Sequence, residues 1–174
     1  MADSVELDLN GTPEEWKKAV IDYVAANPDK PYVIGFGFMA ATFGPDGPKK
    51  EMLDEIVSDR PVILVDEGGH TAWVNSKAFE LAGVDKNTPD PIPGTHFFKR
   101  DADGHPTGWC LEAMTFNPMM AKLGMISKES ILAGSEDLFW LMTSFGITTT
   151  YDAGMSQFED VSYPALAELE AAQK

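Results

Sequence analysis

The chain has 174 residues and a net charge of −15, from 28 acidic and 13 basic residues. This length fits one domain with a sizeable core. The charge argues against nucleic acid and anionic membrane surfaces as partners, because phosphate contacts need clustered Lys and Arg. No run of apolar residues approaches the ~18 that would span a bilayer, and the N-terminal residues do not resemble a secretory signal. The single cysteine, Cys110, excludes an internal disulfide. We expect an acidic, soluble, cytoplasmic protein.

The N-terminal part predicts a helix followed by a strand. Thr12 can cap a helix that Pro13 begins, and Glu15 can close a capping box, so we expect a helix that ends near residues 27–29. Residues 32–36 form a short apolar run rich in β-formers, which predicts a buried strand. The next stretch, GFGFMAATFGPDGP, is rich in glycine and proline and predicts a loop.

The following residues repeat this alternation of helix and strand. Residues 49–57 predict a short helix and residues 61–65 a second buried strand. Asn75 or Ser76 can cap a helix that runs to Ala82, and Gly83 can end it. Residues 85–94 contain three prolines and predict a surface connection.

The second half predicts a β-hairpin and then a long helix. Two strand-like pieces within residues 95–112 flank the sequence DADG, which predicts a hairpin with its turn at Asp101–Gly104. Ser127 begins the longest helical pattern, which reaches about Phe145. The run ITTTYDAG then predicts a strand, and residues 163–173 predict a last helix. The fold class is therefore α/β, in one compact piece: an α/β portion (1–94), the hairpin (95–112), and helices with a strand (113–174).

None of the three histidines, His70, His96 and His105, has the spacing of a local zinc site. His105 follows a turn and His96 begins a strand-like segment, so both favour structural roles. Cys110 lies between Trp and Leu, which favours a buried thiol over a nucleophile. The methionines at positions 114, 119, 120 and 125 favour core packing over a soft-metal site.

The sequence VDEGGHTAWVNS after the second predicted strand is the strongest candidate for a site. His70 follows the carboxyl end of that strand, where ligand groups gather in α/β folds, and Asp152 has the equivalent place after ITTTY. A structural account stays open on the residues alone. In that account Asn75 caps a helix, Trp73 lies in the core, and His70 is a turn residue.

Several segments in this order resemble the family-3 amidohydrolases, the YtcJ-like metal-dependent hydrolases that include N-substituted formamide deformylase. The segment from Arg60 to Ala113 is similar to their strand, D-G-H-x-A-W-V-N-S, T-P-D-P and R-D-x-x-G-x-P-T-G motifs with a following Glu. FGITTTYDAG resembles their G-I-T-T-V-H-D-A-G strand. The resemblance covers about residues 7–155.

The resemblance implies part of a TIM-type barrel: the insertion after the first barrel strand, with its β-hairpin, continuing into the next barrel strand. It implies no catalytic residue and no metal ligand in this chain, because the H-x-H motif and the lysine-bearing segment of the family are missing from it. A divalent metal, zinc by expectation, would belong to the intact family enzyme. The implied substrate-binding residues are His70, Trp73, Asn75, Glu112 and Asp152.

Three departures from the family pattern remove polar groups from this predicted pocket. Gly68 replaces the usual Asp before G-H, GFGFMA lacks the acid of the family's G-W-D-E, and Tyr151 stands where His is usual. The family's substrate class therefore does not transfer to this chain.

Two function classes follow from the sequence. The first is a fragment of a metal-dependent amidohydrolase that hydrolyses amide-type C–N bonds other than peptide bonds and is inactive in isolation. The alternative is a standalone module that binds a small molecule or a partner without catalysis. We also expect self-association, because a truncated barrel would leave apolar faces uncovered.

Overall fold

A computed structural model describes residues 4–152 and 158–172. Its contacts divide these residues into two units, one ending at Leu123 and one beginning at Gly124. The division of one compact piece after residues 94 and 112 stays a prediction. Among the described residues, no helix has both the length and the apolar character needed to cross a bilayer.

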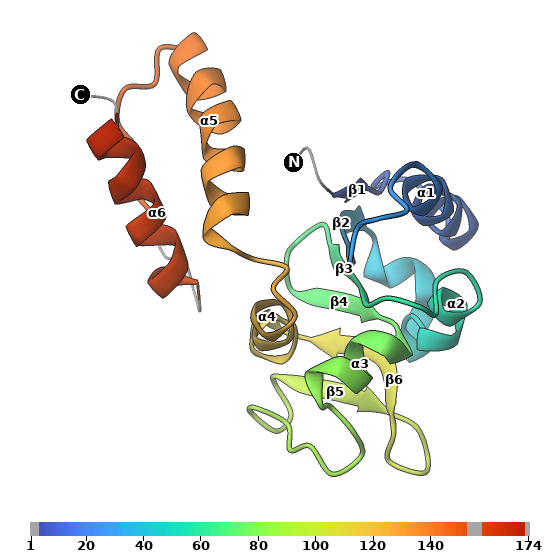
Figure 1. Cartoon of the computed structure of the whole chain (residues 1–174). Coiled ribbons are helices and arrows are strands. Elements are labelled where there is room, and N and C mark those ends of the chain that lie inside the picture. Colours follow the sequence, from blue (N-terminus) through green and yellow to red (C-terminus); the bar gives the residue numbers. More distant parts are fainter. Residues whose placement is uncertain (1–3, 153–157, 173–174) are drawn as a thin grey trace. The chain divides into compact units, whose positions relative to one another are not determined.

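The first unit contains a six-stranded mixed sheet in the order β1-β2-β3-β4-β6-β5 (Figure 1). The strands are β1 (Val5–Glu6), β2 (Val33–Phe38), β3 (Val62–Asp66), β4 (Thr71–Val74), β5 (Phe97–Arg100) and β6 (Pro106–Leu111). The first three are parallel to one another, and β4, β6 and β5 pair in antiparallel fashion. The α/β class and the hairpin are confirmed, whereas β4 was not predicted.

Helices precede or follow these strands, and two of them, α1 and α3, have the N-caps that the sequence predicts. The α-helices of this unit are α1 (Pro13–Ala26), α2 (Lys50–Asp54), α3 (Ser76–Ala82) and α4 (Ala113–Lys122). Thr12 and Glu15 form the predicted capping box at the start of α1. Asn75 caps α3, and Gly83 ends it in the left-handed conformation that glycine adopts without steric cost.

The glycine-rich stretch after the first predicted strand differs from the expected loop. Its first residues extend β2 to Phe38, and residues Ala40–Asp46 form a 3₁₀ segment, η1. Gly35 and Gly37 allow this extension, because a Cβ on Gly35 would lie 2.8 Å from Leu64 of β3 and 3.0 Å from Val5 of β1, and one on Gly37 would lie 2.4 Å from the carbonyl oxygen of Leu7, just after β1. The glycines therefore mark close strand packing and not a flexible connection.

The core on one face of the sheet is aromatic. Trp16 of α1, Phe38 of β2 and Trp73 of β4 are buried with Phe43 of η1 among them, and neighbouring ring centroids lie 5.0–6.2 Å apart. Such edge-on contacts add to the stabilisation from buried apolar area. On the other face, Phe79 of α3 packs edge-on against Phe98 of β5. The sheet is therefore a rigid platform for the residues at its ends.

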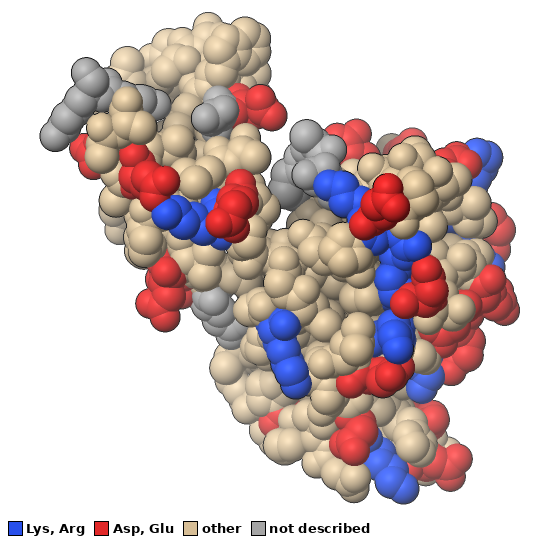
Figure 2. Space-filling model, in the orientation of Figure 1, with Lys and Arg blue, Asp and Glu red and all other residues tan. Residues whose placement is uncertain are grey.

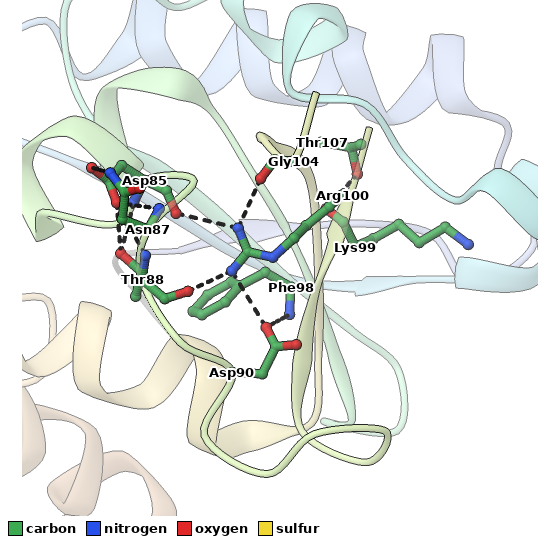
Figure 3. Close-up of polar contacts among 9 residues, drawn as sticks. All are labelled: Asp85, Asn87, Thr88, Asp90, Phe98, Lys99, Arg100, Gly104 and Thr107. Carbon is green, nitrogen blue, oxygen red and sulfur yellow. Dashed lines mark hydrogen bonds and ion pairs between the residues drawn. The ribbon is translucent and has the colours of Figure 1, made fainter. Parts of the chain in front are cut away.

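Arg100 fastens the proline-rich connection to the hairpin (Figure 3). Its guanidinium donates to the carbonyl oxygens of Asp85, Thr88 and Gly104 and contacts the carboxylate of Asp90 at 3.4 Å. Guanidinium donors form a planar fork, which suits several acceptors at once. The predicted surface connection is thus an ordered loop.

The second unit consists of two helices and the segment between them. Helix α5 (Lys128–Ser144) begins after the Ser127 cap, as predicted, and α6 (Glu159–Ala172) packs against it. Helix α6 starts four residues before the predicted start, and the predicted end at Gln173 lies outside the described residues. On the face in Figure 2, the charged side chains of this unit are mostly acidic, whereas acidic and basic side chains lie side by side over the sheet-containing unit.

The predicted strand ITTTYD does not form within the described residues. Residues 147–152 have no strand conformation, and all six are exposed. A strand exists through hydrogen bonds to a neighbouring strand, and none of the described residues supplies one to this segment. Its predicted last residues, Ala153 and Gly154, lie outside the described residues.

Candidate functional site

The candidate site lies at one end of the sheet, where four strands bring their termini together. β2 and β3 end side by side, with Phe38 opposite Asp66. β4 starts at the same end, and its Thr71 lies opposite Leu111, the last residue of β6. The turn of residues 67–70 and the residue after β6, Glu112, therefore lie next to each other.

Asp66 holds the turn that carries His70. Its carboxylate is nearly buried and accepts hydrogen bonds from the backbone N–H of His70 (2.8 Å) and of Thr71 (2.9 Å), and from the Thr71 hydroxyl (3.1 Å). Gly69 completes the turn with a φ of 73°, which a residue with a Cβ rarely adopts. The backbone of His70 is thereby fixed on one side.

His70 and Glu112 form an exposed ion pair at this end of the sheet. The Nδ1 atom of His70 lies 3.0 Å from Oε2 of Glu112, and the side chains are 71% and 38% exposed. Their backbones are also joined, because the N–H of Glu112 donates to the carbonyl oxygen of His70 at 2.6 Å. The hydrogen bond to Glu112, and then its charge, raise the pKa of His70 above its usual value.

The backbone of Glu112 is strained. Among the described residues, it is the one non-glycine residue with a positive φ, and its φ of 69° and ψ of 149° lie in a region that is essentially restricted to glycine. Such a conformation costs on the order of 1–3 kcal/mol when a side chain is present. Glu112 precedes α4, but its side chain makes no capping hydrogen bond to that helix. Its carboxylate instead contacts His70.

The arrangement gives His70 the chemistry of a proton donor or acceptor. With Nδ1 held by a carboxylate, Nε2 is the ring atom left for a ligand, and no described residue forms a hydrogen bond with it. Imidazole changes charge near neutral pH, so such a group can donate or accept a hydrogen bond toward a bound molecule.

Trp73 and Asn75 are fully buried, and Asn75 lies at the opposite end of β4 from this corner, beside Val62 at the start of β3. The indole N–H of Trp73 donates to the carbonyl oxygen of Lys49 at 2.8 Å. The Asn75 amide joins β3, α3 and the chain before β3. It accepts from the N–H of Val62 and of Ala78, and it donates to the carbonyl oxygens of Val57 and Arg60. Both side chains thus have the core and cap positions of the structural account, and their assignment to substrate binding stays a prediction.

Asp152 belongs to the other unit, and its Oδ2 atom accepts a hydrogen bond from the Tyr163 hydroxyl at 2.9 Å. This hydrogen bond raises the pKa of Tyr163. Because the two units are described separately, the predicted grouping of Asp152 with His70 and Glu112 stays a prediction.

The remaining candidates have the surroundings expected of structural residues. His105 is exposed in the hairpin turn, and His96 is half-buried before β5. Cys110 is fully buried, and burial raises the pKa of its thiol well above the usual range, which confirms an inert core position. Three of the four methionines named above, Met119, Met120 and Met125, lie in the core, whereas Met114 is partly exposed.

Sequence reasoning missed Asp66 as a contributor to the site. The sequence does contain an indication of this role. Asp66 ends the apolar run of β3 and is followed, after Glu67, by two glycines. An acidic side chain at that position can accept hydrogen bonds from the turn that follows it.

Comparison with known proteins places this arrangement in a family. The profile of the amidohydrolase family Amidohydro_3 matches residues 4–174. The exoenzymes regulatory protein AepA of Pectobacterium carotovorum is 36% identical over 135 residues, 76% of this chain and 29% of that protein. The putative amidohydrolase YtcJ of Bacillus subtilis is 32% identical over 150 residues, 83% of this chain and 27% of that protein.

An enzyme with a named activity and a solved structure are also similar to this chain. The N-substituted formamide deformylase of Arthrobacter pascens is 36% identical over 87 residues, 49% of this chain and 16% of that enzyme. A metal-dependent hydrolase of Pyrococcus horikoshii OT3 has a similar fold, with a TM-score of 0.62 and 18% identity over 99% of this chain and 31% of that one. The chain thus spans less than a third of the length of these relatives.

The order of the motifs around His70 and Glu112, the profile match over nearly the whole sequence and the shared mixed α/β fold agree with one another. The chain belongs to the amidohydrolase family.

Proposed function

We propose that this chain forms one wall of the substrate pocket in a metal-dependent hydrolase that cleaves amide-type C–N bonds other than peptide bonds. The observation that carries this proposal is the His70–Glu112 pair, which is exposed at the end of the sheet within the segment that carries the family motifs. The relation to a formamide deformylase supports amide-type substrates. In this proposal the chain is the insertion after the first strand of a TIM-type barrel.

The described residues do not fit a metal centre of their own. Among them, no three His, Cys, Asp or Glu side chains lie close enough to hold one ion, and His70 and Glu112 form only a pair. A hydrolytic zinc site needs about three protein ligands and an open position. The divalent metal of the intact enzyme, zinc in our proposal, would therefore be held by residues that this chain does not contribute.

The residues of this chain have two roles in the proposal. His70 faces the substrate, since it is exposed at the sheet end, and Glu112 acts through its contact with His70. Trp73 and Asn75 act indirectly in this proposal, because Trp73 holds β4 in the core and Asn75 fixes the far end of β4 to β3 and α3. Asp152, in the second unit, stays a predicted substrate-binding residue.

A second candidate function is favoured by a cavity in the helical unit. Its volume is about 520 Å³, and it lies between α5, α6 and the segment between them, lined by Phe139, Trp140, Ile147, Leu166 and Leu169 among others. Threonines and Glu170 complete the lining, and a cavity of this size with a mixed lining suits a small, partly apolar molecule. The chain would then act as a binding module without catalysis.

Zinc content and hydrolysis by the purified chain separate these functions. We expect less than about one equivalent of zinc after dialysis and no hydrolysis of N-acyl or formamide substrates, because three ligands are not gathered. Stoichiometric zinc together with amide hydrolysis would overturn the view that the metal site lies outside this chain. Saturable binding of a small, partly apolar molecule that Leu169→Glu abolishes would favour the binding module.

A second experiment tests the pocket assignment in a parent-length enzyme that carries this sequence. His70→Ala should lower kcat/KM by at least about tenfold, or ~1.4 kcal/mol of transition-state stabilisation, with unchanged metal content. Glu67→Ala is the control, because Glu67 is exposed in the same turn but has no contact with the His70 ring. Loss of metal from the His70 variant would contradict the assigned role.

A further inference from the structure

The two residues of the exposed pair are held far more firmly than a surface contact requires. Asp66 fixes the backbone N–H of His70, and the carbonyl oxygen of His70 accepts from the N–H of Glu112. The ring and the carboxylate are thereby brought together from the turn before β4 and from the end of β6. An isolated surface ion pair usually contributes little to stability, so stability does not account for this degree of constraint.

The strained backbone of Glu112 also indicates a constraint other than stability. Glycine would fit the conformation of Glu112 without cost, and the position opens toward solvent, where side-chain packing demands no glutamate. A side chain kept at such a position is the kind of outlier that accompanies a functional constraint. The carboxylate of Glu112 has one described contact with a side chain, the Nδ1 atom of His70.

We propose that Glu112 is a positioning residue: its carboxylate keeps a proton on Nδ1 of His70 and so presents Nε2 outward as the atom that contacts the substrate. The part of this proposal that concerns the substrate rests on the proposed function. When the ring is neutral, Nε2 accepts a hydrogen bond from an N–H or O–H group of a bound molecule. When the ring is protonated, Nε2 donates to a carbonyl or carboxylate oxygen. Glu112 itself does not touch the substrate.

The charged groups that act on His70 among the described residues are Glu112, by hydrogen bond and charge, and Asp66, by charge. Asp66 is committed to the turn, where it accepts three hydrogen bonds. Substitution of Glu112 should therefore change the pKa and the proton position of the His70 ring while Asp66 keeps the turn in place.

Two variants of Glu112 separate its hydrogen bond from its charge. Glu112→Gln keeps an acceptor for Nδ1–H but removes the charge, so the His70 pKa should fall while the neutral ring keeps its proton on Nδ1. Glu112→Gly removes both, so the pKa should fall and the proton should move toward Nε2. Glu67→Gln and Glu67→Gly are the matched controls and should leave the ring unchanged. The ¹⁵N chemical shifts of the His70 ring, followed through a pH titration of the full chain, report both properties.

The thermal midpoint decides whether Glu112 serves function or the fold. Glu112→Gly relieves the backbone strain, so its Tm should equal or exceed that of the original chain, whereas Glu67→Gly should gain nothing. The proposal is overturned if Glu112→Gly leaves the ring proton and the pKa unchanged, or if it lowers Tm more than Glu67→Gly does. These measurements need no substrate. They stand apart from the hydrolysis assays, whose failure would refute the proposed function alone.

Discussion

Two runs of β-forming residues that end in an acidic residue differ in structure, because one forms a strand and the other does not. Residues Val62–Asp66 form the central strand β3, and all five are buried between β2 and β4. Residues 147–152, ITTTYD, have a comparable pattern but are exposed and form no strand among the described residues. The difference shows that β-propensity describes a fit to a half-buried pleated surface and does not create a strand without a neighbour.

The surroundings of the two runs explain the contrast. β3 has a parallel neighbour on one side and an antiparallel neighbour on the other, so its backbone groups are paired within the sheet. The segment after α5 adjoins apolar side chains that are themselves exposed, such as Trp140 (72%) and Phe145 (77%). In the proposed parent barrel, neighbouring strands would cover these groups.

The largest expected effect is the loss of stability in Asn75→Ala. The four groups that hydrogen-bond to the Asn75 amide would lose their partner inside the protein, and α3 would lose its cap. We expect the free energy of unfolding to fall by roughly 2–4 kcal/mol, measured by urea denaturation followed by circular dichroism. Thr148→Ala, in the exposed run, should change it by less than about 0.5 kcal/mol. If both variants lost the same free energy of unfolding, the exposed run would contribute to stability as much as the surroundings of β3, which would contradict the comparison.

A smaller effect is expected from placing charge on the exposed apolar residues of the helical unit. We predict that the purified chain self-associates through this surface, since exposed apolar patches favour association. Phe145→Glu should raise the dissociation constant of the assembly at least about tenfold, ~1.4 kcal/mol, measured by analytical ultracentrifugation.

The control for this effect is Leu81→Glu, which puts the same charge on a 46% exposed leucine of α3 in the other unit. It should leave the assembly unchanged. A monomeric original chain would refute self-association, and equal weakening by both variants would assign it to net charge and not to this surface.

The sequence predicted much of the sheet-containing unit because its signals are local. Thr12, Pro13 and Glu15 announce α1, Asn75 and Gly83 bound α3, and these caps depend on the nearest residues only. The turn at Asp101–Gly104 is equally local, and its Asp101 carboxylate accepts from the backbone N–H of Asp103 and His105.

What the sequence did not reveal depends on partners distant in the chain. β4 is only four residues long, and its identity as a strand comes from β3 and β6 on either side. The run ITTTYD fails as a strand for the converse reason. In the candidate site, the family motifs predicted both His70 and Glu112 as substrate-binding residues. The ion pair itself, 42 residues apart in sequence, follows from the register of β4 and β6.

The smallest expected effect is a pH dependence of stability that arises from the His70–Glu112 pair and not from the rest of the surface. Glu112 raises the pKa of His70 in the folded protein above the value of an unfolded histidine, which is about 6.5. A raised folded pKa means that the folded protein holds this proton more tightly. The stabilisation is therefore fully present below the unfolded pKa and is lost as pH rises through the folded pKa. We expect the free energy of unfolding of the original chain to contain a small decrease over that window.

Denaturation at closely spaced pH values would measure it. The decrease should vanish in His70→Gln and in Glu112→Gln, and it should persist in Glu67→Gln, which leaves the pair intact. Because the pair is exposed, salt should weaken the effect as well, and a decrease that is insensitive to both Glu112→Gln and ionic strength would assign the proton uptake to another group.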